Sequence, residues 1–210
     1  MLKRLQKFIK QKQLKRPEYQ YLFDTPATQE WVCLDLEMTG LNPKTEHILS
    51  VGAIKIVQKD GVLSIDTGNA LSLICRPPTL PSPESIIIHG LRPVDVENGI
   101  SYDELLTQLL PFIGNRPIVG FCIDMDMAFL NAIIKPFLGT TISPELLDVT
   151  ILEQRLRQRK AMSDIAVHRK HLNVLIDEYH IPRLPAHDAL NDALMTAMVF
   201  CHVYQSSQQL

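Results

Sequence analysis

The sequence predicts an α/β fold in which helices flank a mixed β-sheet. Three strand-like segments follow one another through short connections, which indicates an antiparallel meander. From residue 101 onward, helical patterns alternate with short apolar runs, as in a sheet that is continued by helices and strands. With 210 residues, of which 46% are hydrophobic, the chain is long enough for one ordinary domain with a sizeable core.

The meander is expected from residues 31–37, 47–58 and 69–76. The first of these strands leads into a turn-rich loop, and Asp60-Gly61 between the second and third is a hairpin signal. A proline-rich loop, Pro77 to Pro83, then leads to the apolar run 85–90.

The second half begins with Ser101-Tyr102-Asp103-Glu104, which fits the capping box of a helix that should run to about Phe112. A buried strand over 117–123 passes into a helix that extends to Lys135. The remaining expected elements are a short strand over 146–149 and helices over 150–159, 164–180 and 188–204.

The charge is distributed unevenly. Residues 1–16 carry seven Lys and Arg and no acid, whereas the rest of the chain sums to −9. Apolar residues near helical spacing (Leu2, Leu5, Phe8 and Ile9) predict an amphipathic helix. This basic arm fits a solvated helix, a nucleic-acid contact, a docking helix for a protein partner, or a membrane-surface contact. We therefore expect an arm and connector over 1–29, a main domain over 30–204 and a tail over 205–210.

Several classes of protein are disfavoured by composition. No apolar run reaches the roughly 18–20 residues that cross a bilayer, and the N-terminus lacks the apolar segment of a signal peptide. The four cysteines are scattered without Cys-x-x-Cys spacing, which argues against zinc and a disulfide framework. We expect reduced thiols in a cytoplasmic protein.

Several acidic residues lie at predicted strand ends and helix starts, where their carboxylates could bind a cation. Asp35 and Glu37, two apart on a strand, project to the same face, with roughly 6–7 Å between their backbone positions. Two such charges about 5 Å apart repel by about 3 kcal/mol at an effective dielectric of 20, which favours a cation between them. Asp126 follows a buried strand at the start of a helix. Asp192 should lie in the first turns of the last helix, with Asp188 as its N-cap.

His187 precedes that helix on a loop, where an imidazole with a pKa near 6.5 can move in to accept a proton.

Three patterns together resemble a known family. Asp35-x-Glu37 with Thr39-Gly40, then Asp126-x-x-Phe129-Leu130, then His187-x-Ala189-x-x-Asp192-Ala193 are similar to the motifs of the DEDDh 3′–5′ exonucleases. That family has an RNase H-like fold and includes the proofreading epsilon subunit of bacterial replicative polymerases, RNase T and oligoribonuclease. The sequence of the first motif, Asp-Leu-Glu-Met-Thr-Gly-Leu, is also similar to that of oligoribonuclease.

The resemblance implies a two-metal nuclease. Two Mg²⁺ or Mn²⁺ ions would be held by the four acids Asp35, Glu37, Asp126 and Asp192, with His187 as general base. The product would be nucleoside 5′-monophosphates from the 3′ end of nucleic acid, with DNA favoured. The terminal nucleotide would be contacted by a loop and a histidine: Met38, Thr39, Gly40, Leu41 (as an apolar wedge) and His89. RNA trimming, an oligoribonuclease-like activity, and a non-catalytic binding subunit docked to a polymerase remain alternatives.

The chain also departs from the family pattern. Met125 stands where the family has Phe, and Cys122 where it often has Asn or His. Phe129-Leu130 fixes the register and favours Asp126 over Asp124. A haloacid dehalogenase-type phosphatase also begins with Asp-x-Asp-x-Thr, but Glu37 is wrong for its second aspartate and no later Gly-Asp-x-x-x-Asp segment follows.

Overall fold

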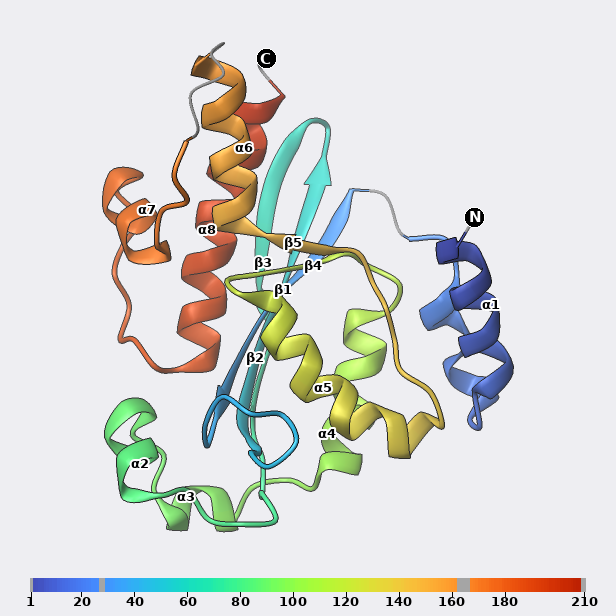
Figure 1. Ribbon diagram of the computed structural model, residues 1–210. Coiled ribbons are helices and arrows are strands. Elements are labelled where there is room, and N and C mark those ends of the chain that lie inside the picture. Colours follow the sequence, from blue (N-terminus) through green and yellow to red (C-terminus); the bar gives the residue numbers. More distant parts are fainter. Residues whose placement is uncertain (1, 27–28, 162–166, 209–210) are drawn as a thin grey trace.

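The computed structural model describes residues 2–26, 29–161 and 167–208. Its centre is a five-stranded mixed sheet with the strand order β3-β2-β1-β4-β5 (Figure 1). The strands are β1 (Glu30–Met38), β2 (Ile48–Lys59), β3 (Val62–Ile74), β4 (Ile118–Gly120) and β5 (Leu146–Asp148). The first three form an antiparallel meander, and β4 and β5 extend the sheet parallel to β1. The predicted mixed sheet is confirmed.

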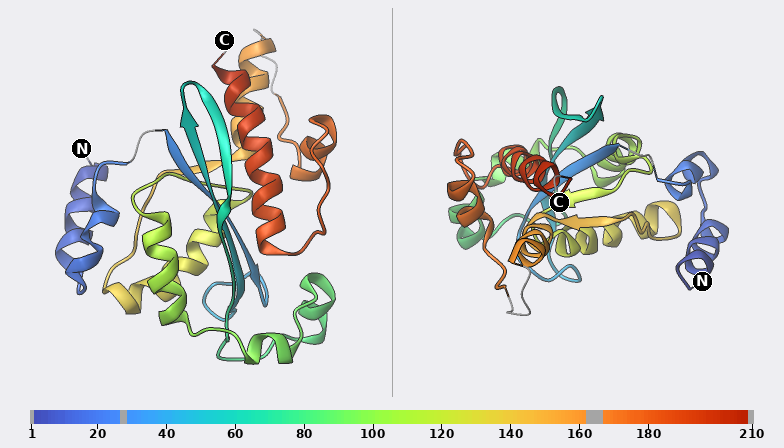
Figure 2. Two further views of the ribbon diagram at one scale, coloured as in Figure 1. Left: turned by 180° about the vertical axis from the view of Figure 1, so that it is seen from behind. Right: turned by 90° about the horizontal axis from the view of Figure 1, so that it is seen from above.

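Helices cover both faces of this sheet (Figure 2). One hydrophobic cluster joins the sheet to helices α4 (Tyr102–Ile113) and α5 (Ile123–Leu138). A second cluster on the other face joins it to helices α6, α7 and α8. These last three helices are α6 (Val149–Ala161), α7 (Leu172–Glu178) and α8 (Ala189–Ser207).

Strand β1 supplies both clusters because its side chains alternate. Val32, Leu34 and Leu36 belong to the α4/α5 cluster, whereas Trp31 and Cys33 belong to the α8 cluster. The strand is therefore buried on both sides along most of its length. Any polar side chain at its carboxyl end is positioned by a rigid scaffold.

The third strand begins seven residues earlier than predicted. Asp60 and Gly61 both have positive φ (52° and 80°), so a two-residue turn pairs Lys59 directly with Val62. Residues 62–69 of this edge strand are largely polar and exposed. Their apolar signal is weak, and the hairpin geometry decides where the strand begins.

Two other differences concern short helices. The helix predicted over 164–180 is α7 alone, because 167–171 is not helical and His171 caps the helix that follows; residues 164–166 lie outside the described residues. Helices α2 (Pro83–His89) and α3 (Pro93–Glu97), which the sequence did not predict, each begin at a proline, a residue favoured in a first turn.

The basic arm and the connector that follows it are packed on the domain. The arm contains helix α1 (Leu2–Gln13), and the connector contains the 3₁₀-helix η1 (Pro17–Phe23). The Lys15 amide donates to the Leu138 carbonyl (2.8 Å), and the Arg16 guanidinium lies 3.7 Å from the Phe137 ring centre. Figure 1 shows α1 on the opposite side of the molecule from α6 and α7. No helix in the described ranges is long and apolar enough to cross a membrane.

Candidate active site

The site forms where β1 ends and α8 begins. Trp31, near the start of β1, packs against Phe200 and Tyr204 of α8, with ring centres 5.5 and 5.0 Å apart. Asp35 lies four residues, about 13 Å, beyond Trp31 along the strand. Asp192 lies eight residues, about 12 Å, before Phe200 along the helix. Because α8 runs back along β1, the Asp192 carboxylate lies close enough to Asp35 to raise the pKa of Asp35.

The first turn of α8 positions the third motif. Asp188 caps the helix by accepting the Asn191 amide at 2.9 Å, so the predicted N-cap is confirmed. The His187 backbone N–H donates to Asp192 Oδ2 at 3.0 Å. His187 itself is exposed on the preceding loop with φ of 62°. Ligand atoms of Glu37, His187 and Asp192 all lie within 4.8 Å of one another.

Gly52 allows this close approach, and the sequence analysis missed it. It pairs with Asp35 across β1 and β2, and a Cβ at this position would lie 2.1 Å from the Ala189 carbonyl carbon and oxygen. The start of α8 therefore rests directly on the backbone of β2. A glycine inside an apolar strand pattern is the signal that indicates such an approach.

The second motif reaches the same place from the other face of the sheet. Helix α5 begins three residues after β4, which is parallel to β1, so both strands end at one edge of the sheet. The Asp126 carboxylate is buried and lies near the Leu36 backbone N–H, which acts to lower its pKa. Asp124, by contrast, is exposed. This difference agrees with the register that favoured Asp126.

The four carboxylates perturb one another. Burial, followed by the charges of Asp126 and Asp192, raises the pKa of Asp35 well above its usual range. Burial and then Asp192 raise the pKa of Glu37 to about 7. Burial raises the pKa of Asp126 to about 8, although backbone N–H groups partly oppose the shift. The pKa of Asp192 is also raised, first by burial, while the His187 amide and ring lower it.

This donor set fits divalent cations. Hard carboxylate oxygens are the ligands that Mg²⁺ and Mn²⁺ take, and cations would offset the repulsion that raises these pKa values. The convergence of Asp35, Glu37, Asp126 and Asp192 from three distant segments is therefore suited to holding metal ions.

The loop after β1 is held by its own hydrogen bonds. Thr39 Oγ1 donates to Glu46 Oε2 (2.5 Å) and accepts the His47 amide (2.9 Å). Gly40 lies against the Glu46 side chain, and Met38 packs on the core. Leu41 at the tip is 75% exposed. Contact of this loop with a terminal nucleotide stays a prediction. Because the Leu41 side chain is exposed, it is accessible to the base of such a nucleotide.

His89 lies at the end of α2, close enough to His187 for the two rings to interact electrostatically. Its ring is buried, and its Nδ1 accepts the Leu91 amide at 3.0 Å. Nε2 therefore carries the proton and donates to Ser85 Oγ, 2.6 Å away. Both ring nitrogens are engaged within α2 and the turn that follows it.

Asp148 fixes the start of α5. Its Oδ2 accepts the Cys122 amide at 2.8 Å and the Arg169 guanidinium at 2.7 Å, and its Oδ1 accepts the Thr150 hydroxyl. Cys122 has a left-handed backbone conformation (φ 53°), which this carboxylate stabilises. Asp148 thus acts on the backbone that leads to Asp126.

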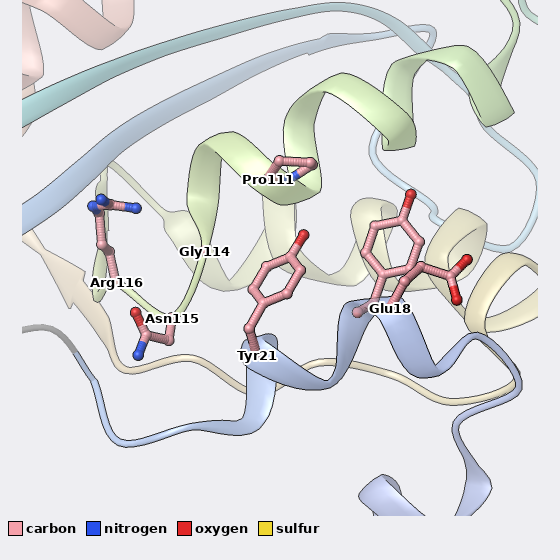
Figure 3. Close-up of a pocket in the computed structure, with 7 residues that line it drawn as sticks. Glu18, Tyr21, Pro111, Gly114, Asn115 and Arg116 are labelled. Carbon is pink, nitrogen blue, oxygen red and sulfur yellow. The ribbon is translucent and has the colours of Figure 1, made fainter.

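A cavity of about 480 Å³ lies elsewhere, between η1 and the end of α4. Figure 3 shows Tyr21 pointing its hydroxyl toward Pro111 beside Asn115 and Arg116. That hydroxyl is buried without a hydrogen-bond partner, and burial raises its pKa to about 12. None of the predicted site residues lines this cavity.

Comparison with known proteins agrees with this geometry. The chain is 29% identical over 180 residues to a PolC-type DNA polymerase III of Thermotoga petrophila, covering 86% of this chain but only 12% of that protein. It is 22% identical over 177 residues to the DNA polymerase III subunit epsilon of Aquifex aeolicus, covering 83% of this chain and 80% of that one.

Among solved structures, E. coli exonuclease I in complex with a dT13 oligonucleotide superposes with a TM-score of 0.68 at 16% identity. The superposition covers 87% of this chain and 42% of that one. This likeness confirms the RNase H-like fold.

The family model described as "Exonuclease" (RNase T) matches residues 32–200, a span that contains all four clustered carboxylates and His187. The chain therefore belongs to the RNase T exonuclease family.

Proposed function

We propose that this protein is a metal-dependent 3′–5′ exonuclease that releases nucleoside 5′-monophosphates from the 3′ end of DNA. The proposal depends on one observation, the convergence of Asp35, Glu37, Asp126 and Asp192 beside the loop histidine His187. Two-metal phosphodiester hydrolysis needs such a carboxylate cluster with a general base within reach.

The residues take distinct roles in this proposal. Asp35, Glu37, Asp126 and Asp192 would hold two Mg²⁺ or Mn²⁺ ions, which when bound assist ionisation of a water and stabilise the leaving 3′ oxygen. His187 takes a proton from the attacking water. The water oxygen bonds to phosphorus as the bond from phosphorus to the 3′ oxygen breaks. The 3′ oxygen takes a proton from solvent, so the shortened strand ends in a 3′ hydroxyl and the released nucleotide carries the 5′ phosphate.

The position of His187 supports the role of base. Its backbone N–H already holds Asp192, so the imidazole can move without disturbing that carboxylate. The grouping of its ring with Glu37 and Asp192 also suits a metal ligand. The two roles predict different outcomes for a substitution of this histidine, as argued below.

DNA is favoured because the relatives are named DNA polymerase III PolC-type and subunit epsilon and because the exonuclease I structure contains a DNA oligonucleotide. The same relatives suggest association with a polymerase, for which the basic arm offers a docking element. RNA trimming and a purely binding role are the competing functions.

A degradation assay separates these functions. A 5′-labelled single-stranded 20-mer of DNA, an RNA of the same sequence and a dinucleotide are each incubated with the protein and Mg²⁺ or Mn²⁺. We expect the DNA to shorten one nucleotide at a time from its 3′ end, with release of nucleoside 5′-monophosphates. If only the RNA is degraded, the substrate is RNA and the proposed DNA substrate is wrong. Strands that stay intact with either metal would make the protein a binding subunit.

Two aspartate variants, one at the site and one as a matched control, test the site itself. Asp192→Asn should abolish the ladder, whereas Asp177→Asn should leave it unchanged, because Asp177 is exposed and its carboxylate pairs with the surface residue Arg183. Equal activity of the two variants would exclude the proposed site.

A further inference from the structure

A second basic segment lies beside the site. Between Arg155 and His171 the chain carries six Lys and Arg, two His and a single acid, Asp164. This segment comprises the second half of α6, residues 162–166, and the stretch that leads into α7.

The segment contacts, at two points, the edge of the sheet where β1 and β4 end. Arg155 lines a hollow of about 120 Å³ together with Ile123 and Asp124 from the start of α5. On the other side, Arg169 pairs with Asp148, which also holds the Cys122 amide. Arg155 of α6 and Arg169 before α7 therefore both lie beside the region from which Asp126 projects.

Three of the cations in this segment have carboxylate partners, and three do not. Arg157 pairs with Glu153, Arg169 with Asp148 and Lys170 with Glu178. Arg155, Arg159 and Lys160 are exposed, and within the described residues no carboxylate lies at ion-pair distance from them. Arg155 and Arg159 are one turn apart on the same helix face. The exposed face of α6 is consequently cationic in an otherwise acidic protein.

We propose that this face of α6 binds the phosphate backbone of a single strand whose 3′ end occupies the catalytic site, a proposal that rests on the function above. Arg159 lies ten residues, about 15 Å, from the start of α6. If the strand is stacked as in B-DNA, at about 3.4 Å per nucleotide, this distance corresponds to about four phosphates.

The N-terminal arm is less suited to this role. It docks at Leu138, twelve residues or about 18 Å along α5 from Asp126, on the side of the molecule away from α6 (Figure 1). Its Lys12 lies over the Phe8 ring, and both Lys12 and Lys15 are exposed. These two lysines therefore provide a control that removes the same charge from the other basic element.

The experiment compares Arg155→Gln/Arg159→Gln with Lys12→Gln/Lys15→Gln. Binding of fluorescent dT20 and dT3 is measured by anisotropy at several salt concentrations, with Ca²⁺ in place of Mg²⁺ to suppress cleavage. Each lost phosphate contact on a single strand should lower the salt slope by about 0.7. For the α6 variant we expect the slope with dT20 to fall by about 1.4 and its affinity advantage over dT3 to shrink. The arm variant should match the wild type.

Two results would overturn the proposal: an unchanged dT20 slope in the α6 variant, or an equal decrease in the arm variant. Circular dichroism and the melting temperature establish that both variants are folded. Because this is a binding measurement, it is independent of hydrolysis. If the wild type binds dT20 but cleaves nothing, the proposed exonuclease function fails while the binding face can still be tested.

Discussion

At the scale of single residues, the site holds four carboxylates whose charged forms are disfavoured first by burial and then by neighbouring acidic charges. Glu37 and Asp126 have pKa values of about 7 and about 8 in the folded chain, against usual values of 4.5 and 3.8. Asp35 and Asp192 are shifted in the same direction. The metal-free native state therefore binds more protons than the unfolded chain between about pH 4 and pH 8, and its stability should fall as pH rises through this window.

The first prediction follows from this expected loss of stability with rising pH. In EDTA the melting temperature should be highest near pH 5 and should decrease toward pH 8.5. Millimolar Mn²⁺ should raise it most at the alkaline end, because a ligand that binds only the native state stabilises that state. Glu37→Gln should flatten the decrease, whereas Glu97→Gln, at an exposed position, should not. A metal-free protein that gains stability up to pH 8.5 would contradict the clustering of these carboxylates.

The second prediction concerns His187. His187→Ala keeps the backbone N–H that holds Asp192 Oδ2, so metal binding should survive while the rate falls by roughly 10²–10⁴-fold. Single-turnover rates and the Mn²⁺-induced melting shift measure the two effects separately. His180 is a matched control, because it is also exposed and has positive φ (52°), and His180→Ala should leave both unchanged. Loss of the metal-induced shift in His187→Ala would make this histidine a ligand.

At the scale of elements, the relation between β1 and α8 decides the site. The sequence motifs predicted the site residues, and the hairpin and helix signals predicted most of the strands and helices. What the sequence did not give is how closely α8 lies on β2, because this distance depends on Gly52, whose missing side chain has an effect only once the helix is placed. Similarly, the start of β3 depends on hairpin geometry and the start of α2 on a proline, and neither has an apolar periodicity of its own.

Gly52 carries the third prediction. In Gly52→Ala the new methyl group would lie against the backbone of Ala189 and Leu190, so the start of α8 must shift. We expect the free energy of unfolding to fall by about 1–3 kcal/mol, as for other overpacked sites, together with a weaker Mn²⁺-induced shift. Gly68→Ala, where a Cβ would make only an ordinary 3.7 Å contact, should change neither quantity. Chemical denaturation with and without Mn²⁺ measures both.

At the scale of the whole molecule, the arm and the domain are one packed unit through η1. The sequence placed the domain boundary at residues 29/30, with a connector before it. However, Tyr19 and Phe23 of that connector are buried in the α4/α5 cluster, and the Tyr19 ring packs edge-on against Phe137 (5.7 Å). We propose that the folded domain begins near Pro17 and that only α1 is an appendage. Two phenylalanines, one in each part, allow this division to be tested.

Phe23 is 5% exposed and Phe8 is 52% exposed. Phe23→Ala removes a ring from the core and should lower the free energy of unfolding by about 3–5 kcal/mol. Phe8→Ala changes the outer surface of α1 and should cost less than about 0.5 kcal/mol. Urea denaturation of both variants gives the two values. Equal small losses would mean that residues 17–23 are a connector after all, and the catalytic domain would then have to be stable without the aromatic side chains of η1.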